Sequence, residues 1–217
     1  MSTSAQYAST PIIWSGNTTT ADASYSAPSN STVGVIAQSL GTGIRIDQID
    51  NITSGTSVAG LHRLFICEGV VGPTISSITS ATTTATLTTA TAHNLITGDI
   101  ITLRSAFPVA YNVTNVAVTV TTSTAFTFTI VSVSGVAARD VGSYASTPTA
   151  PTYRLIKEFA IIAITGSSTV PAFSYSMNSQ TNAEFMPIVL PAGFSLRTTV
   201  SVTQTNALNT TARGGSF

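Results

Sequence analysis

Few side chains in this sequence have the types and spacing that chemistry requires. His62 and His93 are the only histidines, and neither has a second histidine or a cysteine at the spacing of metal ligands. Glu68 and Glu158 could face each other across paired strands, but they lack the aromatic sugar platform expected around a glycosidase site. Strand carboxylates are ordinarily solvated or paired, here with Arg63, Arg154 or Lys157. We therefore expect no catalytic residue, no metal, no cofactor and no enzymatic activity.

The other polar and reactive residues have structural interpretations. Asp47, Asp50 and Asp99 lie beside glycine or polar turns, where carboxylates usually accept hydrogen bonds from backbone N–H groups. Cys67 is the single cysteine and lies in an apolar segment, which predicts a small buried hydrophobic residue. The sequence contains no Gly-x-Ser-x-Gly elbow, phosphate loop or dinucleotide fingerprint.

The composition is nearly free of charge. Only 7% of the 217 residues are charged, the net charge is zero, and the cations are scattered, with Lys157 the sole lysine. Nucleic-acid binding needs clustered cations and a membrane span needs a long apolar segment, so we expect neither partner. The N-terminus shows no signal peptide, which indicates synthesis in a cytoplasm. A surface of hydroxyls and amides favours burial in an assembly, although a threonine-rich secreted β-domain is the alternative.

The segment 153–164 is apolar at both parities of a β-strand, which predicts a strand in the middle of a sheet. The comparable segment 61–68 is predicted to pair with it, although some eighty residues separate the two. Between them the composition changes to Thr, Ser, Ala and Val, which indicates a β-module inserted into a hairpin. We therefore expect an all-β protein: a split, jelly-roll-like β-sandwich with a small inserted β-domain.

The expected domains are an arm at 1–10, a host sandwich at 11–70 and 152–217, and a module at 71–151. The segment 11–14 is predicted as a first strand or an anchor and 15–31 as a loop. A change of parity in the strand 44–53 predicts a bulge near Asp47 or Gln48. Pro171 places the strand 169–177 at a sheet edge, and 143–151 is expected to be a linker. Further strands are predicted at 33–40, 84–89, 100–104, 116–120, 125–131, 186–190, 194–202 and 208–212.

The host segments resemble a family of small structural proteins of tailed bacteriophages. The resemblance is carried by Ile46-Asp-Gln-Ile-Asp50, residues 54–66, 155–158, 169–173 and 190–197, and the near-terminal Gly214-Gly215. Members of that family run without interruption from the Arg-Leu-Phe-Ile strand into the Leu-x-x-Glu strand. The present chain departs from them by the insertion between Glu68 and Tyr153.

The insertion resembles a β-module that recurs in phage capsid and tail appendages, through residues 92–103, Tyr111-Asn112 and Phe126-Thr-Phe128. The resemblance implies that Gly98-Asp99 makes a tight turn and that Tyr111 and the phenylalanines form the core. Val113 stands where the module usually has glycine.

Both resemblances imply a virion component without catalysis. The most concrete role is a capsid decoration or cement protein that binds across joints between major capsid protein subunits as a symmetric homo-oligomer, such as a trimer. Ile12, Ile13 and Trp14 are candidate interface anchors, although the core of the first strand is an equally good interpretation. The alternative is a tail, baseplate or fibre component whose insert binds a host receptor through Phe107 or Tyr111. A secreted adhesive or carbohydrate-binding domain is disfavoured by the absence of a signal peptide.

Overall fold

The computed structural model describes residues 10–29, 31–53, 55–133, 135–166, 173–178 and 187–216. They divide into two compact units, a host unit (1–68 with 152–217) and an inserted unit (69–151). The sequence-based boundaries, after residues 70 and 151, lie beside these. The segment 1–9 of the expected arm lies outside the described residues.

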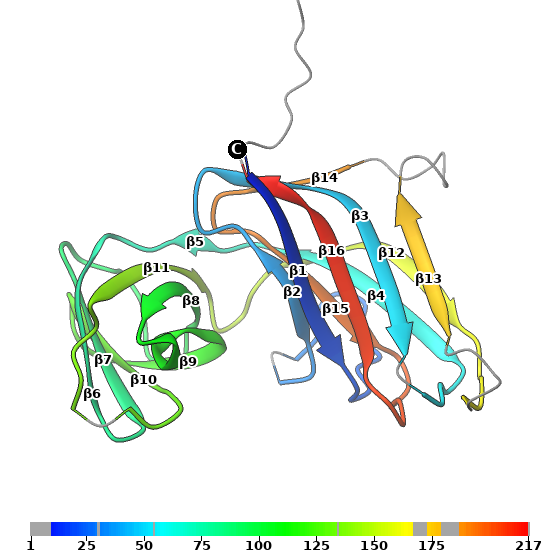
Figure 1. The fold of residues 1–217 in the computed structure, drawn as a ribbon, viewed down its shortest axis with the longest axis horizontal. Coiled ribbons are helices and arrows are strands. Elements are labelled where there is room, and N and C mark those ends of the chain that lie inside the picture. Colours follow the sequence, from blue (N-terminus) through cyan, green and yellow to red (C-terminus); the bar gives the residue numbers. More distant parts are fainter. Residues whose placement is uncertain are drawn as a thin grey trace, which may run out of the picture. The chain divides into compact units, whose positions relative to one another are not determined.

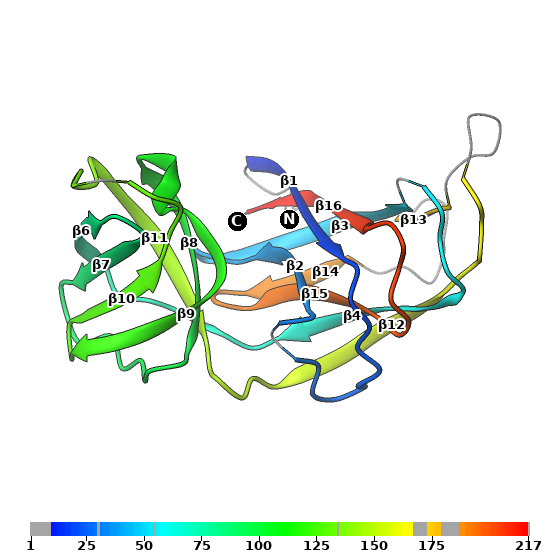
Figure 2. The ribbon, with the colours of Figure 1, turned by 90° about the horizontal axis from the view of Figure 1, so that it is seen from below.

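The described part of the host unit forms a sandwich of two antiparallel sheets, seen as two layers in Figure 2. The β3 sheet has the order β1-β16-β3-β13, with β14 also paired to β3, and the β4 sheet has the order β12-β4-β15-β2. Their bounds are β1 Thr10–Thr18, β2 Gly34–Gln38, β3 Gly43–Thr53, β4 Gly60–Cys67, β12 Tyr153–Ile161, β13 Ser174–Asn178, β14 Ile188–Pro191, β15 Ser195–Val200 and β16 Leu208–Ser216.

The pairing of these strands is nested. The first strand pairs with the last, β2 with β15, β3 with β13 and β14, and β4 with β12. A long hairpin rolled into two sheets in this way is a jelly roll, and the expectation of an all-β, jelly-roll-like sandwich is therefore confirmed. The inserted unit lies between β4 and β12 in the sequence, at the tip of the rolled hairpin.

The predicted pairing of β4 with β12 is confirmed, but the central position expected for β12 is wrong. Phe159 lies opposite His62 in the ladder, whereas nothing described pairs with the other side of β12. A register shift between Leu155 and Lys157 changes the parity of the strand, so Tyr153 and Phe159 pack on opposite faces of the sheet. The bulge thus lets residues of one parity be buried on both faces, whereas Ile156 and Ile162, of the other parity, are exposed.

The bulge predicted in β3 is present. Arg213 of β16 lies opposite Gln48, and the next residue, Gly214, lies opposite Ile46, so Asp47 is the extra residue. The bulge keeps Ile46 and Ile49, which differ in parity, in the same buried core between the sheets. Other members of that core include Ile36, Ile44, Leu64, Phe159, Met177, Leu190, Leu196 and Ala212.

Two glycines allow β1 and β2 to approach closely where the two sheets meet. A Cβ on Gly34 would lie 2.3 Å from the Asn17 carbonyl oxygen, and one on Gly16 would lie 2.4 Å from the Val35 carbonyl oxygen. Neither distance can accommodate a side chain.

The predicted loop at 15–31 begins later than expected, because residues 15–18 continue β1.

The described residues of the inserted unit form a curled antiparallel sheet with the order β5-β11-β8-β9-β10-β7-β6 (Figure 1). The bounds are β5 Val70–Val71, β6 Ile75–Ala81, β7 Thr84–Thr89, β8 Ile100–Phe107, β9 Val113–Thr122, β10 Ala125–Thr129 and β11 Asp140–Thr147, with a 3₁₀ helix η1 at Val109–Tyr111. The four strands predicted here are present, whereas β5, β6 and β11 were not predicted.

The interior of this curled sheet contains the residues expected from the sequence. Tyr111, Phe126 and Phe128 are buried in its core, and Gly98 turns the chain with a φ of +100°. The expected linker at 143–151 is wrong in its first part, because residues 143–147 belong to β11. Tyr144 is buried there against Phe126, with ring centroids 5.5 Å apart.

Candidate interaction surface

The three candidate anchors lie in β1, paired with β16, and they do not share one environment. Trp14 packs against the core between the sheets, and Ile12 is half-buried on the same side of the strand. Ile13 has the opposite parity and is 69% exposed. The structure thus places Trp14 against the core between the sheets, and Ile13 remains the candidate for contact with a partner.

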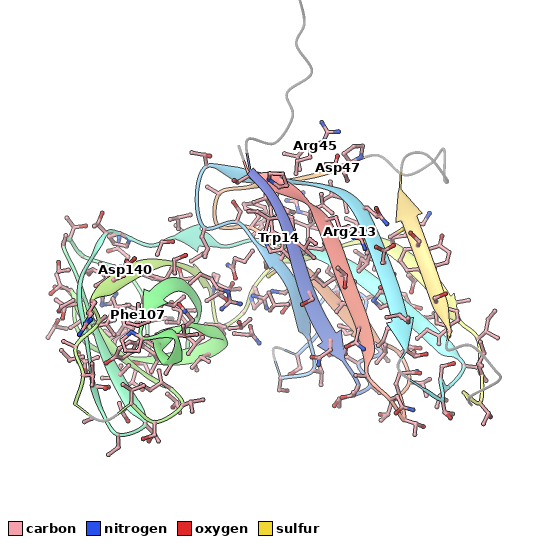
Figure 3. All side chains as sticks on the ribbon, in the orientation of Figure 1. Trp14, Arg45, Asp47, Phe107, Asp140 and Arg213 are labelled. Atoms are coloured by element: carbon pink, nitrogen blue, oxygen red, sulfur yellow. The ribbon has the colours of Figure 1, made fainter. Side chains whose placement is uncertain are left out.

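We call the outward side chains of β1, β16, β3, β13 and β14 the outer face of the β3 sheet. Ile13 belongs to this face, which carries two ion pairs. Arg45 Nε lies 2.6 Å from Asp47 Oδ1, and Arg213 Nε lies 3.5 Å from Asp50 Oδ2. Figure 3 shows Arg45 and Asp47 at one end of this sheet and Arg213 further along it. Sequence reasoning assigned the aspartates to turns, and it missed this surface. Its signal was the alternation of Arg45 and Asp47 two residues apart, which places both on one face of a strand.

Apolar side chains accompany these charges. Ile13 lies opposite Arg213 in the ladder, and Val189 of β14, 55% exposed, lies opposite Arg45. Ile52 of β3 is 51% exposed on the same face, two residues beyond Asp50.

The opposite layer of the host unit, the outer face of the β4 sheet, is largely buried. Arg63 is 2% exposed, its Nε lies 2.7 Å from Glu158 Oε1, and its guanidinium carbon lies 4.0 Å from the Tyr25 ring centroid. Arg63 also donates a hydrogen bond to the Asp22 carbonyl oxygen. The loop between β1 and β2 therefore covers this face, with Arg63 joining the loop to the sheet.

Asp22 anchors the fold of that loop. Burial desolvates its carboxylate, which opposes ionisation, but hydrogen bonds from Thr32 Oγ1 and the Ser24 and Ser29 N–H groups outweigh it. Together with the charge of Arg63 they lower the pKa of Asp22 below its ordinary value. The carboxylate thus organises the loop, as the sequence suggested for aspartates elsewhere.

The two glutamates do not form the pair considered above. Glu158 lies opposite Arg63 in the ladder, whereas Glu68 follows β4 and its N–H donates to the Thr152 carbonyl oxygen. Glu68 instead forms an exposed ion pair with Arg154, at 3.0 Å. The predicted pairing of the glutamates with cations is confirmed, and the alternative in which they face each other is not observed.

His62 lies inside the sandwich in a hydrogen-bonded chain that joins the two sheets. Its Nε2 bonds to Thr198 Oγ1 and lies 3.5 Å from Thr210 Oγ1, which in turn donates to Asn51 Oδ1 at 2.8 Å. The imidazole is 1% exposed, and burial lowers its pKa to about 3. A neutral, enclosed imidazole of this kind is structural, because it cannot reach a substrate or a solvent proton.

His93 and Asp99 line a cavity of about 410 Å³ in the inserted unit. His93 Nδ1 accepts from the Leu95 N–H and its Nε2 bonds to the Thr122 carbonyl oxygen. Asp99 accepts from the N–H groups of Ile96 and Thr149. The polar atoms of these two side chains are therefore engaged in hydrogen bonds within the inserted unit.

An exposed apolar tip lies elsewhere in the inserted unit. Phe107 ends β8 and Val109 begins η1, and both are exposed; Figure 3 shows Phe107 near Asp140, its ladder partner. Val136 is also exposed, and its carbonyl oxygen accepts a hydrogen bond from the buried Tyr111 hydroxyl. Of the two aromatic candidates for receptor contact, Phe107 is therefore accessible and Tyr111 is not.

The described residues contain no group of three or more His, Cys, Asp or Glu side chains placed to hold a metal ion. In the same part of the chain, no helix has the length and apolarity needed to span a membrane. The buried Cys67 has no disulfide partner, since it is the single cysteine.

In comparisons with known proteins, no family model, no curated protein and no solved structure matches this chain.

Proposed function

We propose that this protein is a non-enzymatic structural component of a bacteriophage virion, most concretely a capsid decoration or cement protein. It would be made in the host bacterial cytoplasm and bind as a homo-oligomer across neighbouring major capsid protein subunits. Contacts that are individually modest stabilise a shell when symmetry repeats them many times.

The observation that carries the proposal is the jelly roll with a second folded unit at the tip of its β4–β12 hairpin. Jelly rolls are common in viral capsid proteins, and the fold by itself is compatible with other roles. The state of the reactive groups supports a non-catalytic role, because His62, His93 and Glu158 are each engaged in hydrogen bonds or ion pairs that hold the fold.

The composition of the protein surface supports a role in an assembly. Large side chains such as Ile13, Val189 and Phe107 are exposed in a chain with few charges. Exposed apolar residues on a weakly charged surface favour association over isolation.

Quantitative mass spectrometry of purified virions tests the proposal by counting copies of this chain relative to the major capsid protein. A decoration protein is expected at one copy per capsid subunit or per few subunits. A count of only a few copies per particle contradicts the cement role, and absence from the particle contradicts the virion role.

The exposed tip at Phe107 and Val109 favours a second candidate function, a tail, baseplate or fibre component whose inserted unit contacts a host receptor. The same copy count separates the two, because tail components are present in far fewer copies than capsid subunits. For the tail role, Phe107→Ser is expected to reduce adsorption of virions to host cells without changing the copy number.

A further inference from the structure

We propose that the outer face of the β3 sheet is a self-complementary contact through which two copies of this chain associate face to face. The inference deepens the proposed function, on which its relevance to a virion rests, by naming the surface that builds the oligomer. Its test uses the isolated protein, so its outcome is independent of the virion copy count.

The charge pattern of this face fits a second copy of the same chain. Arg45 and Arg213 alternate with Asp47 and Asp50, so the four charges sum to zero. A two-fold axis that lies in the plane between two such faces can bring the arginines of one copy towards the aspartates of the other, as an isologous contact requires. Nucleic acid or an anionic membrane would instead select a face of one sign.

The ion pairs are available for such an exchange. The side chains of Arg45, Asp47 and Arg213 are 37%, 46% and 56% exposed, so each pair can gain a second partner without leaving a buried charge. Exposed pairs contribute little to the stability of a single chain. They set register and specificity when two faces meet, because like charges in contact are unfavourable.

The apolar side chains of the face supply the contacts that lose water. Ile13 lies beside Arg213, and Val189 lies beside Arg45. Ile52 adds a third exposed β-branched side chain. Small hydroxyl and amide side chains fill the ladder positions between them, including Ser15, Asn17, Ser174, Ser176, Asn209 and Thr211. Two twisted sheets with such faces can pack in the aligned manner of a β-sandwich.

The size of the face sets the expected strength. Strands β1 and β16 have nine residues each, which corresponds to a length of about 30 Å. Four strands side by side give a face of about 500 Å², so two copies would bury on the order of 1,000 Å² in total. This is the lower limit for a specific interface, and we expect reversible association in the micromolar range.

Sedimentation equilibrium of the full chain, up to a concentration of about 100 µM, tests the proposal with a matched pair of variants. Ile13→Asp changes the face, and Ile162→Asp changes a similarly exposed isoleucine (62%) just beyond β12 in the other sheet. We expect the unchanged protein and Ile162→Asp to dimerise, and Ile13→Asp to weaken dimerisation at least tenfold. Equal association of both variants, or an unchanged protein that stays monomeric, would overturn the proposal.

A charge-reversal experiment provides a second test, in which two variants of the face are measured separately and then as a mixture. Arg213→Asp makes the face acidic and Asp50→Arg makes it basic, so each variant alone should associate more weakly than the unchanged protein. An equimolar mixture should form a heterodimer. The same reversals at the exposed Arg154–Glu68 pair are the control and should change nothing. A mixture that associates no better than its components contradicts the assigned face.

Discussion

His62 should make the host unit sensitive to mild acid. The imidazole has an ordinary pKa of 6.5, and burial lowers its pKa to about 3 in the folded protein. Between these two values the unfolded chain binds a proton that the folded chain does not bind. The contribution of His62 to the free energy of unfolding is therefore complete above pH 6.5 and is lost progressively as the pH falls towards 3.

The expected size of the effect follows from this window. Lowering the pH from about 7.5 to about 5 protonates nearly all of the unfolded histidine and almost none of the folded one, which costs about 2 kcal/mol. The pKa of Asp22 is lowered, so the stability that it contributes is lost only as the pH falls below its ordinary value of 3.8. The chosen range thus separates the histidine from this carboxylate.

Urea unfolding at the two pH values, followed by tryptophan fluorescence, measures the effect. Trp14 is the single tryptophan and lies against the core of the host unit, so its emission reports that unit. In His62→Gln the pH-dependent difference should shrink by about 2 kcal/mol, whatever the stability of the variant at neutral pH. His93→Gln removes the other histidine and serves as the matched control.

Two results would refute this reasoning. One is an unchanged protein whose unfolding free energy is equal at both pH values. The other is a His62→Gln variant that keeps the full pH dependence. If His62→Gln does not fold, nuclear magnetic resonance of the unchanged protein still tests the idea, since the His62 ring should stay neutral at pH values near 5 while the protein remains folded.

Three further changes test the packing. Gly34→Ala should destabilise the host unit by about 1–3 kcal/mol because its Cβ would overlap a backbone carbonyl of β1. Gly41→Ala, with open space around the new carbon, should be neutral in the same urea assay. Arg63→Met should cost about 2–4 kcal/mol and expose the β1–β2 loop to proteolysis, whereas Arg154→Met should change stability by less than about 0.5 kcal/mol; equal effects would contradict the buried role of Arg63. Tyr144→Phe should not lower the calorimetric stability of the inserted unit, because the buried hydroxyl has no hydrogen-bond partner among the described residues. Burial also raises the pKa of Tyr144 to about 12, and ionisation of the Tyr144 hydroxyl near pH 10 would contradict the buried position of this side chain.

Local pattern was a good guide where one residue decides the geometry. The change of parity around Asp47 predicted the bulge that the pairing of Arg213 and Gly214 shows. For the bulge, the chain within a few residues contains the physical cause. The turn at Gly98 and the burial of Tyr111 were instead expected from the resemblance of the insertion to the β-module, and both are present.

Pattern was a poor guide where distant elements decide the environment. Residues 143–147 looked like a linker, yet they form part of β11, because pairing with β8 overrides their weak local preference. The strand β12 looked central because both parities are apolar, yet it lies at an edge with a bulge. Burial on both faces is a property of neighbours that a single strand does not encode.

The same division between sequence and tertiary structure applies to the candidate surface. Sequence alone determined the scarcity of charge, the β-rich character, the break into host and inserted segments and the choice of residues 12–14 as candidate anchors. Only the tertiary structure decided that Trp14 faces the core while Ile13 faces outwards beside Arg213. It also brought Arg45, Asp47, Asp50 and Arg213 together on one face. The reason is the nested pairing of the jelly roll, which joins the first, third and last strands in one sheet through backbone hydrogen bonds that carry no sequence signal of their own.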